Sequence, residues 1–551
     1  MLKTIQLSIL FYLLIFTSCK DTSKPEDWRT IFNYNEMNDV TSLDPAAASN
    51  FENIGPVNQL YNGLVQMDDS LNVKPCIAKQ FNISPDGLCY TFNLRNDVYF
   101  HDNICFENGK GRKVTAKDFS FSFNRLFDSK VSSATTLLNK IDRSEKTNFK
   151  GFIPVNDSVF KIYLTEPFST FINILTMKYF SVLPYEAIDY YKNDFRRNPV
   201  GTGPFIFKLW DEGNKLILIK NPSYFERDTK NVRLPYLDAV TVSFIKDRET
   251  AFMELLNGKF DMLSGANAFN TNEVLDKDAN LRDFYSKKFY LQKETFLKTD
   301  YIGILVDPNL ALVKNSPLKL KAIRKAINYA FDRDKLVKYL RNSLGKAAHA
   351  GFIPKGMKSY NPQAVKGYSY RPDKVGELLK EAGFPGGKGL PELTLHVTND
   401  SKEQVEYIQS QLAENHIKIN ISIEKASVLR QAVNSCEYNF FKKSWFADYA
   451  DEENFMSLFY SKNFTPQGVN FFHFKNETFD KAYEKVQTIN NPEEKIRLYQ
   501  KMDSLIIDEA PVIPLFYDEV VRLVSLHIQH LTTNPMNLLN LKFVIKDAEK
   551  K

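Results

Sequence analysis

A strand–helix–strand pattern in the second half of the chain constrains the fold most. Residues 393–397 and 417–423 have the apolar character of strands, strictly alternating in the second, and residues 403–413 between them fit a helix. Two strands joined by a helix form a βαβ unit, which makes a parallel sheet with a right-handed crossover. The sequence therefore predicts an α/β lobe in this part of the chain, from about residue 300 to 505.

Other periodic segments extend the mixed α/β pattern over the rest of the chain. Ser316 followed by Pro317 predicts the start of a helix, and Asp373 is expected to cap a second helix that ends at Gly383. Apolar and polar residues alternate at 160–164 and at 240–244, which predicts a half-buried strand at each place.

The N-terminus predicts export. Charged Lys3 precedes a mostly apolar run at residues 5–16 that is too short to span a membrane, and Thr17, Ser18 and Cys19 follow. The order resembles the lipobox of bacterial lipoproteins. The resemblance implies a signal peptide at 1–18, lipid on Cys19, a polar tether to residue 27, and a place in the cell envelope facing the periplasm or exterior. The alternative is an ordinary signal peptide with an incidental cysteine.

Length and composition narrow the class of protein. The 551-residue chain far exceeds the roughly 250–300 residues at which one hydrophobic core stops growing, so two or more lobes are expected. It is 43% hydrophobic and 25% charged, as in globular proteins, and its net charge of +6 comes from interspersed lysines and acids. We therefore expect no nucleic-acid-binding face.

Cysteine and histidine usage gives no sign of a metal site or cofactor. Export would permit a disulfide among Cys76, Cys89, Cys105 and Cys436, although four free thiols are equally compatible with the sequence. CxxC and HExxH patterns are absent and the seven histidines are scattered, so we expect no metal. No GxSxG elbow or phosphate-binding glycine loop occurs, so no catalytic residue is assigned.

The most informative segment for function is residues 444–449, which follow a strand-like run at 438–443. Open α/β sheets bind ligands in the crevice beyond the carboxyl ends of their strands. Asp448 could there meet a cation, and Trp445 could form the wall of a pocket. The alternative is a surface turn in which Asp448 caps the following helix.

A series of short motifs occurs in order along the chain. They are Leu43-Asp44-Pro45, LYNGLV at 60–65, SPDG at 84–87, YTFNLR at 90–95, VTAKDF at 114–119, PVGTGPF at 199–205, LNGKFD at 256–261, IRKAINYAFDR at 323–333, WFADY at 445–449 and APVIPLFY at 510–517. In this order the motifs resemble the family 5 extracellular solute-binding proteins, the oligopeptide, dipeptide and nickel receptors of ABC importers. Two departures from the family pattern are the segment 103–112, which is longer than the usual short turn, and Asn62, which stands in place of an acidic residue.

This resemblance implies a two-lobed, periplasmic-binding-protein-like α/β fold with mixed sheets and a discontinuous first lobe. The first lobe is expected at residues 28–298 and 506–551, with an inserted subdomain at about 61–185, and the second at 299–505. Ligand would bind between the lobes and favour the closed form, which an ABC permease recognises. The receptor is expected to be a monomer without enzymatic activity.

The resemblance also implies roles for particular residues. In peptide-binding members an aspartate at the position of Asp448 pairs with the α-ammonium of the ligand. The backbone at Ser444 and Phe446 would then align the peptide as an added strand, and Trp445 would line a side-chain pocket. The remaining candidate binding residues are Tyr449, Lys442 or Lys443 for the ligand's carboxylate, and Asn50 with Phe51 in the first lobe.

Several alternatives remain open from the sequence. Lys442 and Lys443 could equally form a solvated edge, and strand alternation allows only one of them to point into the cleft. The same fold could bind a nickel chelate, an oligosaccharide or a haem-like compound instead of a di- or oligopeptide. A secreted hydrolase or a structural lipoprotein is a further possibility, against which the order of the motifs and the missing nucleophile motif both count.

Overall fold

The computed structural model describes residues 30–132, 134–144, 151–489 and 491–547. The predicted signal peptide at 1–18, Cys19 and the predicted tether to residue 27 lie outside these residues. Within the described ranges, no helix is both long and apolar enough to cross a bilayer.

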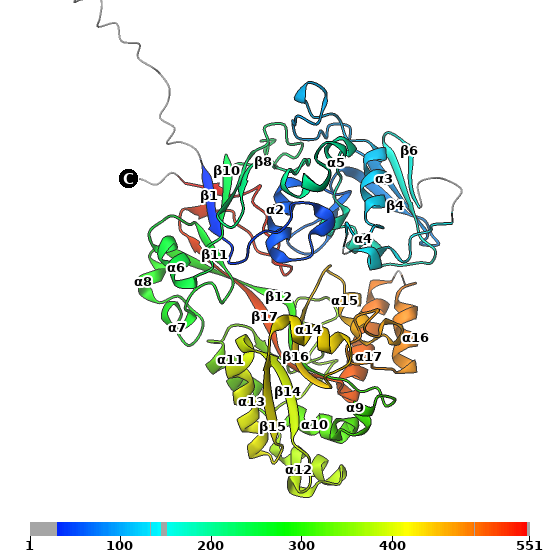
Figure 1. Cartoon of the computed structure of the whole chain (residues 1–551), viewed down its shortest axis with the longest axis vertical. Coiled ribbons are helices and arrows are strands. Elements are labelled where there is room, and N and C mark those ends of the chain that lie inside the picture. Colours follow the sequence, from blue (N-terminus) through cyan, green and yellow to red (C-terminus); the bar gives the residue numbers. More distant parts are fainter. Residues whose placement is uncertain (1–29, 133, 145–150, 490, 548–551) are drawn as a thin grey trace, which may run out of the picture.

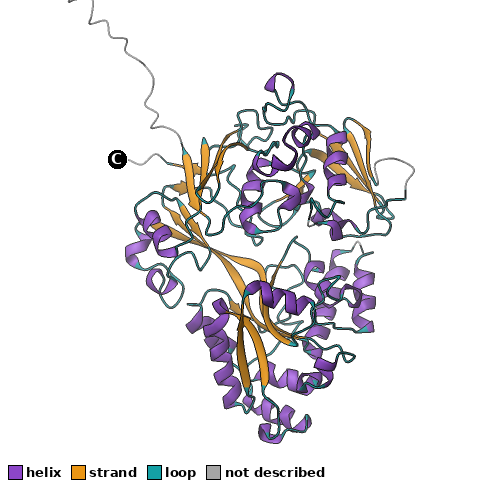
Figure 2. Cartoon of the chain, viewed as in Figure 1, coloured by secondary structure: helices purple, strands orange, loops and turns teal. Residues whose placement is uncertain are grey.

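One mixed sheet of eleven strands runs through both lobes of the molecule (Figure 2). Its order is β15-β14-β16-β12-β17-β11-β1-β10-β9-β8, and β13 pairs with β17 beside this path. The strands are β1 (Ile31–Asn35), β8 (Phe205–Asp211), β9 (Lys215–Lys220), β10 (Ala239–Ser243), β11 (Met262–Ser264), β12 (Phe289–Ile304), β13 (Lys346–Ala347), β14 (Leu393–Thr398), β15 (Ile419–Glu424), β16 (Phe440–Phe446) and β17 (Val512–Ser525).

The long antiparallel strands β12 and β17 connect the two lobes (Figure 1). The first half of β12 pairs with the second half of β17, which lies beside β11 in the first lobe. The second half of β12 lies between β16 and the first half of β17. The register of the ladder shifts between Thr295 and Thr299, so the pairing is interrupted where the strands pass from one lobe to the other.

The second lobe contains the predicted strand–helix–strand unit. Strand β14 pairs in parallel with β15, from Leu393 opposite Ile419 to Thr398 opposite Glu424, which confirms the prediction. The helices of this lobe are α9 (Ala311–Lys314), α10 (Lys321–Tyr329), α11 (Arg333–Leu340), α12 (Pro372–Glu381), α13 (Lys402–Glu414), α14 (Ala426–Asn434), α15 (Glu453–Met456), α16 (Glu477–Val486) and α17 (Pro492–Glu509).

Two predicted helix starts in this lobe were wrong in detail. Ser316 and Pro317 begin only a short 3₁₀ turn, η7 (Pro317–Lys319), and α10 begins separately at Lys321. Asp373 lies within the first turn of α12 rather than at its cap, because Pro372 already occupies the first helical position. Proline fixes a helical φ and needs no amide partner there.

The first lobe carries a second, smaller sheet. Its strand order is β4-β5-β7-β6, and α3 packs against β6 and β7. Thr115 caps α3 with a complete capping box to Asp118. The remaining elements are α2 (Phe51–Leu60), α3 (Ala116–Arg125), α4 (Phe171–Ile174), α5 (Tyr185–Tyr191), α6 (Arg248–Leu256), α7 (Thr271–Val274), α8 (Asp283–Ser286), β2 (Val65–Met67), β3 (Val73–Pro75), β4 (Ala78–Ile83), β5 (Cys89–Leu94), β6 (Phe152–Asn156), β7 (Val159–Tyr163), β18 (Ile528–Gln529) and β19 (Ile545–Lys546).

The four cysteines downstream of Cys19 are free thiols. Burial raises the pKa of Cys76 to about 12 and that of Cys105 to about 11. Of the two possibilities that the sequence left open, the structure therefore has the free thiols.

Candidate functional site

A cavity with about 570 Å³ of open space lies between the two lobes, close to the connecting strands. The second lobe contributes the three residues at the end of β16, and the first lobe contributes the start of α2, the segment 176–179 and two residues near the C-terminus. Its lining consists of Ala48, Ser49, Phe51, Ile54, Met67, Thr176, Met177, Lys178, Tyr179, Phe446, Ala447, Asp448, Met536 and Leu538.

Strand β16 positions the segment that the sequence singled out. The strand does not stop at Lys443, as the sequence suggested, but continues to Phe446, because it pairs with β12 as far as Phe446 opposite Lys298. The amide of Ala447 then donates to the carbonyl of Leu297 at 2.8 Å. Asp448 is therefore held two residues beyond the strand end, where it lines the cavity.

The carboxylate of Asp448 is left without a cationic partner among the described residues. Within the described ranges, the one hydrogen-bond donor to this carboxylate is the Asn454 side-chain amide, at a long 3.5 Å. The side chain is exposed to the cavity, yet burial by the surrounding protein raises its pKa, an effect that Asn454 partly offsets. Asp448 is not a helix cap, since α15 begins at Glu453 with Glu452 at its cap.

The other acids of this segment are bound by groups of the protein itself. Asp451 accepts from Lys495 Nζ at 3.0 Å and from the Tyr499 hydroxyl at 2.9 Å. Glu452 accepts from the amide of Ser359 at 2.7 Å, and Glu453 accepts from the hydroxyls of Tyr449 and Tyr483. Asp448 is therefore the acid of residues 448–453 that remains available to a ligand.

Trp445 and Asp448 are held by the same side chain. The indole Nε1 of Trp445 donates to Asn454 Oδ1 at 2.9 Å, and the backbone amide of Asp448 donates to that oxygen at 3.3 Å. Tyr449 is buried against the core of the first lobe, with its hydroxyl 2.5 Å from Glu453 Oε2. Tyr449 thus connects the lobes and is absent from the cavity lining.

The two candidate lysines of β16 differ in their surroundings. Lys442 is buried and donates to Asp300 Oδ1 at 2.9 Å. Asp300 also lies 3.1 Å from Lys298. Burial alone would raise the pKa of Asp300, but the two ammonium groups hold it well below its usual range.

Lys443 contacts an aromatic ring instead of a carboxylate. Its ammonium lies 4.3 Å from the centroid of the Phe471 ring, and burial, assisted by nearby Arg430, lowers its pKa to about 8. Neither Lys442 nor Lys443 lines the cavity that contains Asp448.

One edge of β16 is unpaired where a ligand strand was predicted. Strand β14 pairs with β16 only at His396 opposite Phe441, whereas β12 pairs with the other edge along its whole length. Within the described residues, the backbone from Lys442 to Phe446 therefore has no strand neighbour on the β14 side.

The first-lobe candidates lie at the start of α2. Phe51 lines the cavity, and its ring centroid is 4.9 Å from that of Phe446 in the second lobe and 5.9 Å from that of Phe296. Asn50 is the exposed N-cap residue of α2, although its side chain makes no capping bond. The structure thus brings Phe51 and Phe446 together across the lobes.

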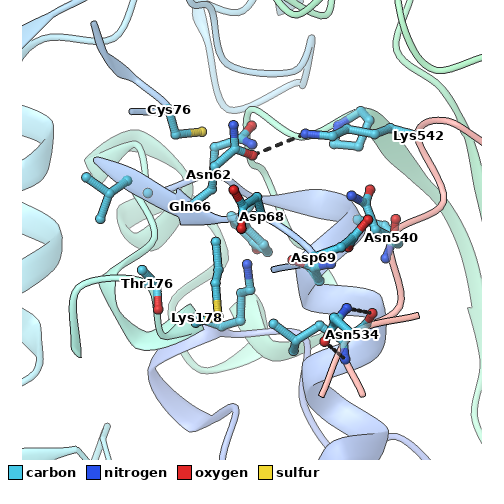
Figure 3. A pocket seen from close by; sticks show the side chains of 18 of the residues that line it. Asn62, Gln66, Asp68, Asp69, Cys76, Thr176, Lys178, Asn534, Asn540 and Lys542 are labelled. Atoms are coloured by element: carbon cyan, nitrogen blue, oxygen red, sulfur yellow. Dashed lines mark hydrogen bonds between the residues drawn. The ribbon is translucent and has the colours of Figure 1, made fainter. Parts of the chain in front are cut away.

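Sequence reasoning missed a polar recess of about 680 Å³ in the first lobe, which Figure 3 shows. It adjoins the cavity, because Met67, Thr176, Lys178 and Leu538 line both. Asn62, noted in the sequence only as a departure from the family pattern, is one of its walls. The other residues come from segments far apart in the chain, such as Asp69, Asn534, Asn540 and Lys542, so no local pattern could have marked them.

The lobes also touch at the rim that faces away from the connecting strands. The amide of Ser169 donates to the carbonyl of Gln487 at 3.1 Å, and the side-chain amide of Asn173 donates to Asp451 at 3.3 Å. Contacts at both rims therefore bound the cavity. Among the described residues, no group of three or more His, Cys, Asp or Glu side chains could hold a metal ion.

The architecture, with one sheet that passes through two lobes and a cavity between them, is that of a solute-binding receptor. The sequence matches the family described as bacterial extracellular solute-binding proteins, family 5 (middle part), over residues 72–467, so the chain belongs to this family. It is a solute-binding receptor of an ABC importer rather than an enzyme, from an extracellular or periplasmic family.

Relatives and solved structures agree with this assignment. The chain is 28% identical over 501 residues to the glutathione-binding protein GsiB of Salmonella choleraesuis (strain SC-B67), covering 89% of each sequence. It is 26% identical to the periplasmic binding protein DppA of Helicobacter pylori in complex with the peptide STSA, with a TM-score of 0.76 over 94% of this chain and 98% of that one. The binding protein AgaA of A. tumefaciens R10 in complex with agropinic acid shares the fold, at 20% identity and a TM-score of 0.73 over 94% and 99%.

Proposed function

We propose that this receptor binds short peptides with a free N-terminus between its lobes, with Asp448 paired to the α-ammonium. The observation that carries the proposal is that the carboxylate of Asp448 has no cationic partner among the described residues. It faces the inter-lobe cavity, and its protein contacts leave the charge uncompensated. A ligand ammonium would supply charge-assisted hydrogen bonds that the protein does not.

Other candidate residues would bind the backbone and the side chains of the peptide. The unpaired edge of β16 at Ser444 and Phe446 can accept an extended peptide as an added strand, which gives affinity through the backbone and tolerance of side chains. Phe51 supplies aromatic surface inside the cavity, and Asn50 lies beside it at the start of α2. We assign a side-chain pocket to the half-buried Trp445, which lies next to Phe446 but outside the cavity lining. Relatives that bind glutathione or the peptide STSA support a peptide ligand.

Closure of the lobes is part of this proposal. The sequence-based bounds are 28–298 and 506–551 for the first lobe, with an inserted subdomain at about 61–185, and 299–505 for the second. We place the return crossing within β17, because α17 runs to Glu509 in the second lobe and the first half of β17 pairs there with β12. The interrupted pairing of β12 and β17 between Thr295 and Thr299 supports a hinge there. A ligand that contacts both lobes binds the closed form more strongly and shifts the population toward it.

The same proposal includes a lipid anchor on Cys19 and a monomeric receptor. Conversion of Cys19 to serine would then release the protein from the membrane fraction and abolish labelling by a radioactive fatty acid. Membrane association and labelling that both survive in C19S would contradict the anchor. Size-exclusion chromatography with light scattering of the protein without residues 1–19 tests the monomer.

A comparison of trialanine with N-acetyl-trialanine tests the ammonium site. Calorimetry on protein without residues 1–19 should detect trialanine and reduced glutathione, and the acetylated peptide should bind at least about 100-fold more weakly, as expected when a buried charge loses its partner. Equal affinities would rule out the role of Asp448. A non-peptide solute is the second candidate, because AgaA shares the fold. Native mass spectrometry of freshly purified protein would identify such a ligand directly.

A further inference from the structure

Lys178 is a second uncompensated charge in the same cavity. It begins the 3₁₀ turn η5 (Lys178–Phe180) of the first lobe and lines both the inter-lobe cavity and the polar recess. Figure 3 shows its amino group pointing into the recess. No hydrogen bond or ion pair to this ammonium exists among the residues that the structure describes. Burial lowers its pKa to about 8, so it is still mainly protonated at neutral pH.

The other charged groups around Lys178 do not neutralise it. The carboxylate of Asp68 accepts bonds from the amides of Ser70 and Asn72 in its own loop, and Asp69 lies beyond ion-pair distance of Lys178. Cys76, whose pKa burial raises to about 12, is a neutral thiol. A ligand anion is therefore the group that can complete this site.

The neighbouring lysines are already occupied or lie elsewhere. Lys542 forms an ion pair with Glu226 at 2.5 Å, and Lys495 forms one with Asp451 at 3.0 Å. Lys442 is bound to Asp300, and Lys443 lies over Phe471 outside the cavity. Lys178 is thus the uncompensated cation that shares the cavity with Asp448.

We propose that the ligand is a short dipolar peptide whose carboxylate binds Lys178 while its ammonium binds Asp448. This inference rests on the proposed function and extends it to the second charge. The two anchors belong to different lobes, so a ligand that carries both charges holds the lobes together. A ligand with only the ammonium engages the second lobe without this link, and it discriminates less between the open and closed forms.

The test compares trialanine with trialanine amide, which differ only in the carboxylate. Wild-type protein should bind the free acid about 10- to 100-fold more tightly, the range expected for a hydrogen-bonded charge. In K178Q the two affinities should agree within about two-fold. The variant K79Q removes the same charge from an exposed site on the first lobe, and it should keep the wild-type preference.

A further variant decides between the two uncompensated lysines. If K443Q lost the preference for trialanine over trialanine amide while K178Q kept it, the carboxylate site would lie in the second lobe and the proposal would be wrong. An unchanged preference in K178Q, or equal binding of both peptides to wild type, would also overturn it. Failure of the proposed function has a different signature, because N-acetyl-trialanine would then bind wild type as well as trialanine does.

Small-angle X-ray scattering of wild-type protein supplies a measurement that does not depend on a variant folding. Saturating trialanine should reduce the radius of gyration, and saturating trialanine amide should reduce it less. An equal reduction with both peptides would show that the carboxylate does not link the lobes.

Discussion

Phe51 in the first lobe and Phe446 in the second lie with their ring centroids 4.9 Å apart, at an interplanar angle of 43°. Both line the inter-lobe cavity, so the contact that joins the lobes is also a wall of the candidate site. An aromatic pair contributes about 0.5–1.5 kcal/mol beyond the burial of its surface. In the closure that we propose, this contact therefore favours the closed form even without a ligand.

Replacement of Phe51 by alanine should weaken closure. We expect F51A to increase the radius of gyration of the ligand-free protein and to weaken trialanine binding by about 1 kcal/mol. Scattering and calorimetry measure the two effects. The control is F284A, which removes an exposed ring from α8. Equal behaviour of F51A and F284A would show that the Phe51–Phe446 contact does not support closure.

Replacement of Asp448 by asparagine should remove the ammonium site while keeping the shape of the side chain. Binding of trialanine should weaken by about 3–5 kcal/mol, the cost of leaving one buried charge of a pair without its partner. D400N neutralises an exposed acid of the same lobe and should bind normally. Wild-type affinity in D448N, measured by calorimetry, would contradict the assignment.

The affinity for trialanine should fall in acid. Burial raises the pKa of Asp448 above its usual 3.8, and only the ionised carboxylate pairs with an ammonium. Binding favours the deprotonated carboxylate, so between pH 7 and the pKa of Asp448 in the free receptor the affinity changes little, and below that pKa it falls about ten-fold per pH unit. Calorimetry from pH 7 to 4 should show this fall in wild type and a flat profile in D448N. A flat wild-type profile would contradict the prediction.

The sequence predicted the parts of the site that depend on local order. Alternation and helix periodicity identified β14, α13 and β15, and the strand-like run at 438–443 placed Asp448 beyond the end of a strand. These features involve residues that are neighbours in the chain. Phe51 was predicted only from its place in the family pattern, after Leu43-Asp44-Pro45, and its contact with Phe446 was not predicted.

The partners of the charged residues could not be read from the sequence. Asp300 meets Lys442, 142 residues away, only because the antiparallel register of β12 and β16 pairs Asp300 with Ser444, two positions along the strand from Lys442 and on the same face. The ammonium of Lys178 lies in a recess whose other walls come from distant segments, and the acids among them, Asp68 and Asp69, belong to one loop that does not pair with it. Whether a charge is neutralised inside the fold or left for a ligand is therefore a property of the tertiary structure.

Cys436 should react faster than Cys76 and Cys105 in the folded receptor. Its Sγ lies 3.2 Å from Nε2 of His473, whose Nδ1 lies 3.3 Å from Asp307 Oδ2. Burial acts to raise the pKa of Cys436, but the contacts with His473 and Thr465 lower it below its usual value. We expect iodoacetamide at pH 7 to modify Cys436 before Cys76 and Cys105, as measured by peptide mass spectrometry, because the thiolate is the nucleophile. H473Q should slow this reaction, and an unchanged rate would contradict the role of the imidazole.

Lys442 should be needed for stability rather than for binding. K442M leaves Asp300 buried with Lys298 as its remaining partner, so we expect a loss of about 3 kcal/mol, the lower end of the cost of breaking a buried pair. The control K443M removes a lysine of the same strand that has no carboxylate partner in the described structure, and it should cost less.

The pH dependence of unfolding provides a separate check on the Lys442–Asp300 pair. The pKa of Asp300 is depressed in the folded protein, so its contribution to stability is present above about pH 4, the unfolded value, and is lost as the pH falls below it. Urea unfolding at pH 7 and pH 3 should therefore show a smaller difference between K442M and wild type at pH 3. Folded K442M should still bind trialanine within about two-fold of wild type. On the binding scale a ten-fold change corresponds to about 1.4 kcal/mol, so the expected change is much smaller than that. Weak binding by folded K442M, with little loss of stability, would assign Lys442 to the ligand site instead.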